Sequence, residues 1–143
     1  MTQDARRRLE DLLDREIEAA HALAATLASE KAALTGDSPE AVEQKAAEKI
    51  RVLAAIERLE EERRMLCANP LSSGIAATVA ERWRALMAVM AGCRTANEVN
   101  GHIIHVRQHQ IRQLIDIVRG GPAITYDPQG KIFGKALRAL AKA

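Results

Sequence analysis

The chain has 143 residues, of which 48% are hydrophobic, 28% are charged and only 2% are aromatic. This length suits one domain, and a core built almost entirely from aliphatic side chains is more typical of helical bundles than of sheet proteins. The net charge of +2 is too small to indicate a polyanion partner, although residues 131–143 hold four basic residues and no acidic one.

The first predicted helix runs from about Asp4 to Leu34. Leucine, isoleucine and alanine recur along it at spacings of three and four, which is typical of a helix with one apolar face. A helix of ~30 residues is ~45 Å long at 1.5 Å per residue, which indicates an elongated molecule. Glu16 lies near the apolar face, and we expect it to pair with a basic residue of the second helix.

A break at residues 35–39 separates this helix from a second one, predicted from about Pro39 to Ala68. We expect Gly36 to take the left-handed position after the first helix, and Asp37 or Ser38 to cap the second. So short a connection forces an antiparallel hairpin. The apolar face of the second helix is expected to contain Val42, Ala46, Ile50, Leu53, Ile56, Leu59 and Leu66.

A third helix is predicted from about Ile75 to Arg119. The segment Asn97–Gly101 weakens its middle, but no proline intervenes, so we expect one continuous helix. Two interpretations of Asn97 and Asn100 remain open. Asn-Gly favours a helix break, whereas polar side chains in an apolar pattern can also face a partner or another helix.

Gly120, Gly121 and Pro122 end the third helix. We therefore predict an all-α fold, an elongated antiparallel three-helix bundle or coiled coil over residues 1–120. A C-terminal tail follows over residues 121–143. Its closing residues can form a short amphipathic helix, with basic side chains opposite the apolar ones.

No group of side chains forms a recognisable catalytic or metal site. His105 and His109 are four residues apart on a predicted helix, but the glutamate of a zinc hydrolase motif is missing between them. Cys67 and Cys93 are far apart and are expected to be reduced thiols. No serine or cysteine has a base partner at a known spacing. We expect neither enzyme activity nor a bound metal or cofactor.

Protein binding is the function class that remains. The scarcity of aromatic residues argues against nucleic-acid binding, and no apolar run is long enough to span a bilayer. The charged N-terminus is unlike a signal peptide, so a cytoplasmic protein is expected. Three long helices with narrow apolar stripes can leave a groove, which is a natural seat for an amphipathic helix of another protein.

Residues in the second half of the chain give it a resemblance to a known family. They are Trp83, Asn97, Asn100, Gly101, Ile103, Ile104, Leu114, Tyr126 and Gly130, with weaker support from Glu16, Lys45 or Lys49, and Arg63. In their order and spacing, the chain resembles the FlgN family of flagellar type III export chaperones over nearly its whole length. Asp127 and Pro128 depart from the family's pattern, in which a glycine is common after the tyrosine.

The resemblance implies a chaperone that binds the C-terminal helical segments of the hook–filament junction proteins FlgK and FlgL. It would keep them unassembled and deliver them to the export-gate component FlhA, as a monomer that forms a one-to-one complex. The substrate is then held by the C-terminal part of the bundle, through Asn97, Asn100, Ile103, Ile104, Ile111, Leu114, Ile115 and Val118. Docking to the gate is assigned to Tyr126 and Gly130.

Two other classes of protein remain open. A structural coiled-coil adaptor without chaperone activity would form a stable homodimer, which light scattering distinguishes from a monomer that binds one junction protein. A surface binder of membrane or nucleic acid would act through its basic tail. In that case, deletion of residues 131–143 abolishes the main activity, and binding collapses as salt is added.

Overall fold

The computed structural model describes residues 1–120, which contain three helices and no strand. They are α1 (Gln3–Leu34), α2 (Pro39–Leu66) and α3 (Ala77–Val118). The all-α prediction is confirmed, and every helix begins and ends within two residues of its predicted bounds. The predicted tail, including Tyr126 and Gly130, lies outside the described residues.

The chain divides into two compact units between Asn100 and Gly101. Unit 1 consists of residues 1–100 and holds α1, α2 and the first part of α3. The described part of unit 2 is residues 101–120, which form the rest of α3 and the turn after it. The helix is continuous across the division, as predicted, so Asn97–Gly101 is not a helix break. The predicted boundary at residue 120, between bundle and tail, adjoins residues outside the described part and stays a prediction.

The side chain of Thr35 ends α1. Its hydroxyl donates to the carbonyl oxygens of Lys31 at 3.2 Å and Ala32 at 3.0 Å. Because these last carbonyls are satisfied in this way, no left-handed residue is needed. The prediction that Gly36 takes a left-handed conformation was wrong. Among the described residues, it is Gly120, just after α3, that ends a helix with a positive φ, of 72°.

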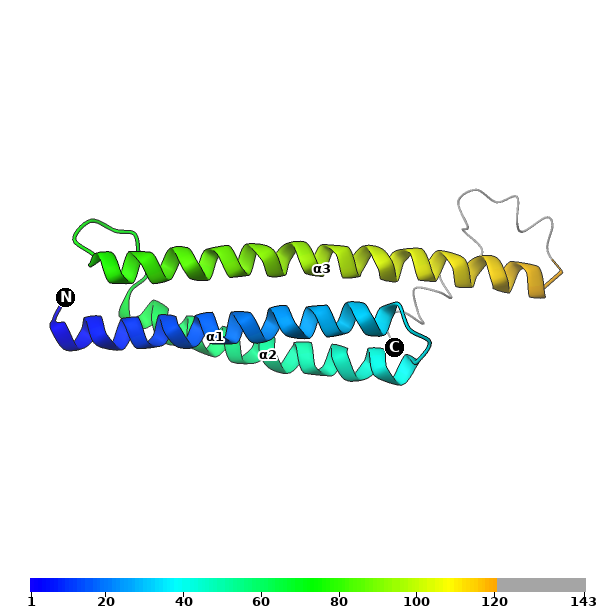
Figure 1. Cartoon of the computed structure of the whole chain (residues 1–143), viewed down its shortest axis with the longest axis horizontal. Helices are drawn as coiled ribbons and strands as arrows, with labels where there is room; N and C mark the ends of the chain where they lie inside the picture. Colours follow the sequence, from blue (N-terminus) through cyan, green and yellow to red (C-terminus); the bar gives the residue numbers. More distant parts are fainter. Residues whose placement is uncertain (121–143) are drawn as a thin grey trace. The chain divides into compact units, whose positions relative to one another are not determined.

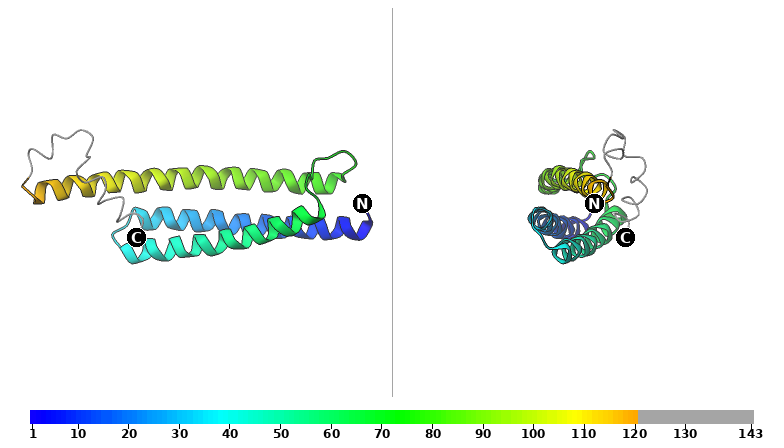
Figure 2. Two further views of the ribbon diagram at one scale, coloured as in Figure 1. Left: turned by 180° about the vertical axis from the view of Figure 1, so that it is seen from behind. Right: turned by 90° about the vertical axis from the view of Figure 1, so that its right-hand side faces the viewer.

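Of the two predicted candidates, Asp37 and Ser38, it is Ser38 that caps α2. Its hydroxyl accepts a hydrogen bond from the backbone N–H of Ala41 at 3.2 Å, and Pro39 occupies the first helical position. The short connection makes α1 and α2 antiparallel, and they lie side by side in both the front and the rear view (Figures 1 and 2).

The helices of unit 1 pack through positions that alternate in steps of four and three, which we call seam positions. This is the heptad spacing of a coiled coil. On α1 every seam residue is buried: Leu9, Leu13, Glu16, Ala20, Leu23, Leu27, Glu30 and Leu34. On α2 the seam residues are half-buried or buried: Val42, Lys45, Lys49, Val52, Ile56, Leu59, Arg63 and Leu66.

The seam of α2 corrects the predicted apolar face of that helix. Ile50 and Leu53 were expected in the core, but they are 67% and 39% exposed. The seam passes instead through Lys49 and Val52, which are half-buried. Counted back from Arg63, these two positions keep the alternating steps of four and three. The predicted face was right at Val42, Ile56, Leu59 and Leu66, and it missed the polar seam residues Lys45, Lys49 and Arg63.

The first part of α3 completes the core of unit 1. One cluster joins Leu9, Leu13 and Ala20 of α1 with Val79 and Leu86 of α3, and a second joins Leu23 and Leu27 with Cys93. Both cysteines are free. Within residues 1–120, no helix is long and apolar enough to cross a membrane.

Candidate partner-binding surface

A buried ion pair joins α1 to α2, and its arginine also contacts an aromatic ring of α3. The Arg63 Nε donates to both carboxylate oxygens of Glu16, at 3.2 and 2.9 Å. Both side chains are at most 5% exposed. The guanidinium carbon also lies 4.6 Å from the centre of the Trp83 ring. We call these three residues the Arg63 layer; it confirms that Glu16 pairs with a basic residue of the second helix.

Burial has the largest influence on the pKa of the Glu16 carboxyl. It raises the pKa of this group above its ordinary value, and the charge and hydrogen bonds of Arg63 lower that pKa only in part. Glu16 therefore depends on Arg63 to remain charged at acceptable cost.

A second polar cluster links the same helices nearer the division between the units. Lys49 Nζ lies 2.9 Å from Glu30 Oε2 and donates to Asn97 Oδ1 at 3.4 Å. Asn100 Nδ2 donates to Glu30 Oε1 at 2.9 Å and to the carbonyl of Leu27 at 3.0 Å. The exposed fractions of Glu30 and Asn100 are only 3% and 2%. We call this cluster the Glu30 layer.

The two layers are separated by the same fourteen residues on each helix. The corresponding pairs are Glu16 and Glu30 on α1, Arg63 and Lys49 on α2, and Trp83 and Asn97 on α3. Fourteen residues are two heptads, so each helix uses one face for both layers. Polar residues in a coiled-coil seam specify register, which is the role we infer for both layers.

The two asparagines of the Glu30 layer, both predicted to bind a partner, have different surroundings: Asn100 is buried and Asn97 is exposed. Asn100 faces α1, and both hydrogens of its amide are used inside unit 1, so its side chain is not available to a partner. Asn100 is therefore a polar side chain that faces another helix, and its prediction as a partner-binding residue is corrected. Asn97 is exposed, although its Oδ1 accepts from Lys49. Glu30 was missed, and stepping the heptad from Glu16 along α1 would have found it.

On α3, Leu86, Cys93 and Asn100 are buried at intervals of seven residues, and positions with the same four-and-three spacing follow in unit 2. These positions are Ile104, Arg107, Ile111, Leu114 and Val118. The apolar ones are exposed by 37% at Ile104, 47% at Ile111, 61% at Leu114 and 86% at Val118. Ile103 and Ile115 are half-buried and lie at the edges of this face. We call these seven residues the unit 2 stripe.

The helix geometry thus brings the six predicted apolar site residues onto one face. At 100° per residue they span an arc of about 120°. A seam is normally covered by another helix, and the stripe has the spacing of a seam with much of its apolar surface open to solvent.

The other side of α3 in unit 2 mixes polar side chains with the exposed Val106 and Ile117. His109 accepts through Nδ1 from the Arg112 guanidinium at 2.6 Å, and its other ring nitrogen lies 3.3 Å from the Gln113 amide. Among residues 1–120, no three acidic, histidine or cysteine side chains are placed to hold a metal ion.

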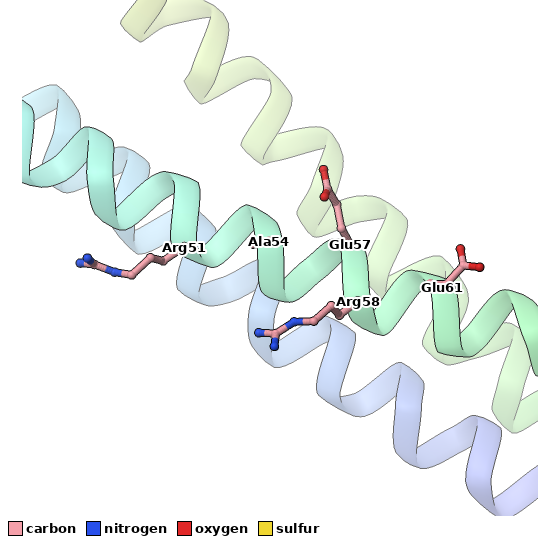
Figure 3. Close-up of a pocket in the computed structure, with 5 residues that line it drawn as sticks. All are labelled: Arg51, Ala54, Glu57, Arg58 and Glu61. Atoms are coloured by element: carbon pink, nitrogen blue, oxygen red, sulfur yellow. The ribbon is translucent and has the colours of Figure 1, made fainter.

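Two hollows in unit 1 are weaker candidates. Figure 3 shows the first, where Arg51, Ala54, Glu57, Arg58 and Glu61 all come from α2 and the charged side chains spread apart. This is a solvated helix face. The second is a cavity of about 200 Å³ beside the Glu30 layer. It is lined by Leu23, Leu27, Lys49, Leu53, Met90, Cys93, Arg94 and Asn97.

Comparison with known proteins settles the family. The model of the family described as FlgN protein matches residues 1–132. The chain belongs to the FlgN family. No curated protein and no solved structure matches it.

Most of the described residues that carry the FlgN resemblance fall into two groups, and Tyr126 and Gly130 lie outside the described residues. Those in unit 1 form the two polar layers: Glu16, Lys49, Arg63, Trp83, Asn97 and Asn100. Ile103, Ile104 and Leu114 lie in the unit 2 stripe. The first group is buried or hydrogen-bonded within unit 1, and much of the apolar surface of the second group is exposed.

Proposed function

We propose that this protein is a cytoplasmic export chaperone whose unit 2 stripe binds the C-terminal helical segments of FlgK and FlgL. FlgN membership supports a flagellar export-chaperone role in general. The observation that carries the finer proposal is the stripe itself, a row of exposed apolar side chains at core spacing. The proposed contact residues are Ile103, Ile104, Ile111, Leu114, Ile115 and Val118, with Asn97 beside them.

The physics of the stripe suits a chaperone that must also release its cargo. Each Å² of apolar surface that a partner buries contributes about 25 cal/mol to the free energy of binding. Ordering a disordered segment as it binds costs roughly 2–5 kcal/mol of that gain. Because the cost of ordering offsets part of the gain from burial, a one-to-one complex can protect an amphipathic segment and still dissociate at the gate.

Replacing Leu114 with aspartate is expected to weaken binding of a FlgK or FlgL C-terminal segment by about tenfold or more, because an unpaired carboxylate enters an apolar contact. Leu114 is 61% exposed, so the fold should tolerate the change. Calorimetric titration measures the affinity, and Ile104→Asp provides a second variant.

The matched control for this substitution is Met65→Asp. Met65 is 81% exposed on α2, outside the stripe, so the same change there should leave substrate binding unaltered. A folded Leu114→Asp variant with wild-type affinity would place the binding surface elsewhere.

We also propose that the tail docks the loaded chaperone to the cytoplasmic domain of FlhA through Tyr126. One rigid aromatic ring with a polar tip, next to a turn-forming sequence, suits a docking anchor. Tyr126→Ala is expected to weaken binding to FlhA about tenfold while sparing FlgK and FlgL binding. Equal FlhA affinity of variant and wild type in a calorimetric titration would reject this assignment.

A further inference from the structure

The cavity beside the Glu30 layer lies within unit 1 and has a volume of about 200 Å³. Residues of α1, α2 and α3 all line it. The exposed side chains of Leu53, Arg94 and Asn97 are among them, so solvent and solutes can reach it. An engineered apolar cavity of about 150 Å³ is large enough to bind benzene, so this one has room for a small organic molecule.

The polar and apolar residues of this cavity come from different levels of the helices. Lys49 and Asn97 belong to the Glu30 layer itself. The apolar residues lie three to seven residues from that layer in the direction of the Arg63 layer, and they are Leu23, Leu27, Leu53, Met90 and Cys93. Methionine is flexible and polarisable, so Met90 can adapt to the shape of a ligand. The cavity therefore suits a molecule with an apolar end and a polar end.

The charge of the cavity is positive. Among the described residues that line it, Lys49 and Arg94 are basic and none is acidic. Glu30, which lies 2.9 Å from Lys49, balances one of these two charges. Arg94 is exposed and forms no ion pair within residues 1–120. The remaining positive charge favours a ligand with one negative charge.

We propose that this cavity binds a small carboxylic acid whose apolar body is about the size of a benzene ring. The apolar body lies among the leucines and Met90, and the carboxylate accepts hydrogen bonds from Arg94 and Lys49. A guanidinium suits this role because it can donate two parallel hydrogen bonds to one carboxylate. The site belongs to unit 1, so the inference does not depend on the function proposed for the unit 2 stripe.

Calorimetric titration of the full chain with phenylacetate tests the proposal. For so small a ligand we expect a dissociation constant of about 1 mM or lower. The uncharged phenylacetamide should bind about fivefold more weakly, because it cannot form charge-assisted hydrogen bonds with the two cations. Acetate has the charge without the ring, so it should show no measurable binding at the same concentration.

Arg94→Met removes the exposed charge and keeps an apolar stem. It should weaken phenylacetate binding about fivefold and leave phenylacetamide binding unchanged, a pattern that a general loss of structure would not produce. Arg84→Met is the matched control. It removes an exposed arginine from an earlier turn of α3 that does not line the cavity, so both affinities should keep their wild-type values.

Nuclear magnetic resonance locates the bound acid. Phenylacetate should shift the backbone amide signals of Leu23, Leu53 and Cys93, which line the cavity from three helices. Shifts confined to the unit 2 stripe would overturn the inference, as would equal affinities for phenylacetate and phenylacetamide. Unchanged phenylacetate affinity in Arg94→Met, or no binding up to about 10 mM, would also overturn it.

Discussion

Replacing Arg63 with methionine is expected to destabilise unit 1 by about 3–5 kcal/mol, the usual cost of leaving a buried charge without its partner. Glu16 would remain only 4% exposed with no cation beside it. The substitution also removes the guanidinium from the face of Trp83. Urea unfolding followed by circular dichroism measures the loss.

The neighbouring residue supplies the control for this prediction. Arg64 pairs with Glu60 at 2.7 Å, but its side chain is 61% exposed, so Arg64→Met should cost less than about 1 kcal/mol. The double variant Glu16→Leu with Arg63→Met should recover most of the lost stability, because no charge is then buried. Similar losses for Arg63→Met and Arg64→Met would show that the buried pair does not support the fold.

The pH dependence of the Arg63→Met variant gives a second readout. Burial raises the pKa of Glu16 even with Arg63 present, and removing Arg63 removes the main influence that lowers it. A carboxyl whose pKa is higher in the folded state binds more protons there, so its burial costs most above that pKa. The destabilisation should therefore be largest at neutral pH and shrink as the pH falls toward 4.5, the ordinary value.

Replacing Asn100 with aspartate is expected to cost about 2–4 kcal/mol at neutral pH. The side chain would keep its shape, but it would lose both donated hydrogen bonds, to Leu27 and Glu30. A buried carboxylate would then face the Glu30 carboxylate across a contact of 2.9 Å in the native protein. Urea unfolding at neutral and acidic pH measures the effect, which should lessen as the new carboxyl takes up a proton.

The same substitution three residues earlier, at Asn97, should leave the stability of the protein almost unchanged. Asn97 is exposed and already accepts a hydrogen bond from Lys49, so a carboxylate there keeps an acceptor in place and adds charge attraction. Asn97→Asp is expected to stay within about 0.5 kcal/mol of the wild type or to be slightly more stable. Equal losses in the two variants would mean that the Glu30 layer is not organised as described.

The elements of the fold could be read from local signals. Ser38 and Pro39 mark the start of α2, and uninterrupted apolar spacing without proline predicts α3 as one helix. The ending of α1 could not be read so easily, since Thr35 and Gly36 offer two ways to satisfy the same carbonyls. The hydroxyl contact decides between them only once the chain is folded.

The arrangement of the candidate surface could be predicted from the sequence for its apolar residues but not for Asn100. Apolar residues from Ile103 to Val118 share a face because helix geometry alone dictates it. Whether Asn100 faces a partner or α1 depends on a residue seventy positions away in the sequence, Glu30. No local pattern carries that information.

The sequence by itself determined that residues 1–120 form three long helices, with an apolar face along the first and an apolar row near the end of the third. The breaks between helices and the periodicity within them are local properties, so they can be read without knowledge of the fold. Only the tertiary structure decided that Glu16, Glu30 and Asn100 belong to buried layers and that Ile111, Leu114 and Val118 are exposed. The reason is that burial depends on which side chains from distant parts of the sequence pack against a helix face. The residues of that face alone do not determine which side chains these are.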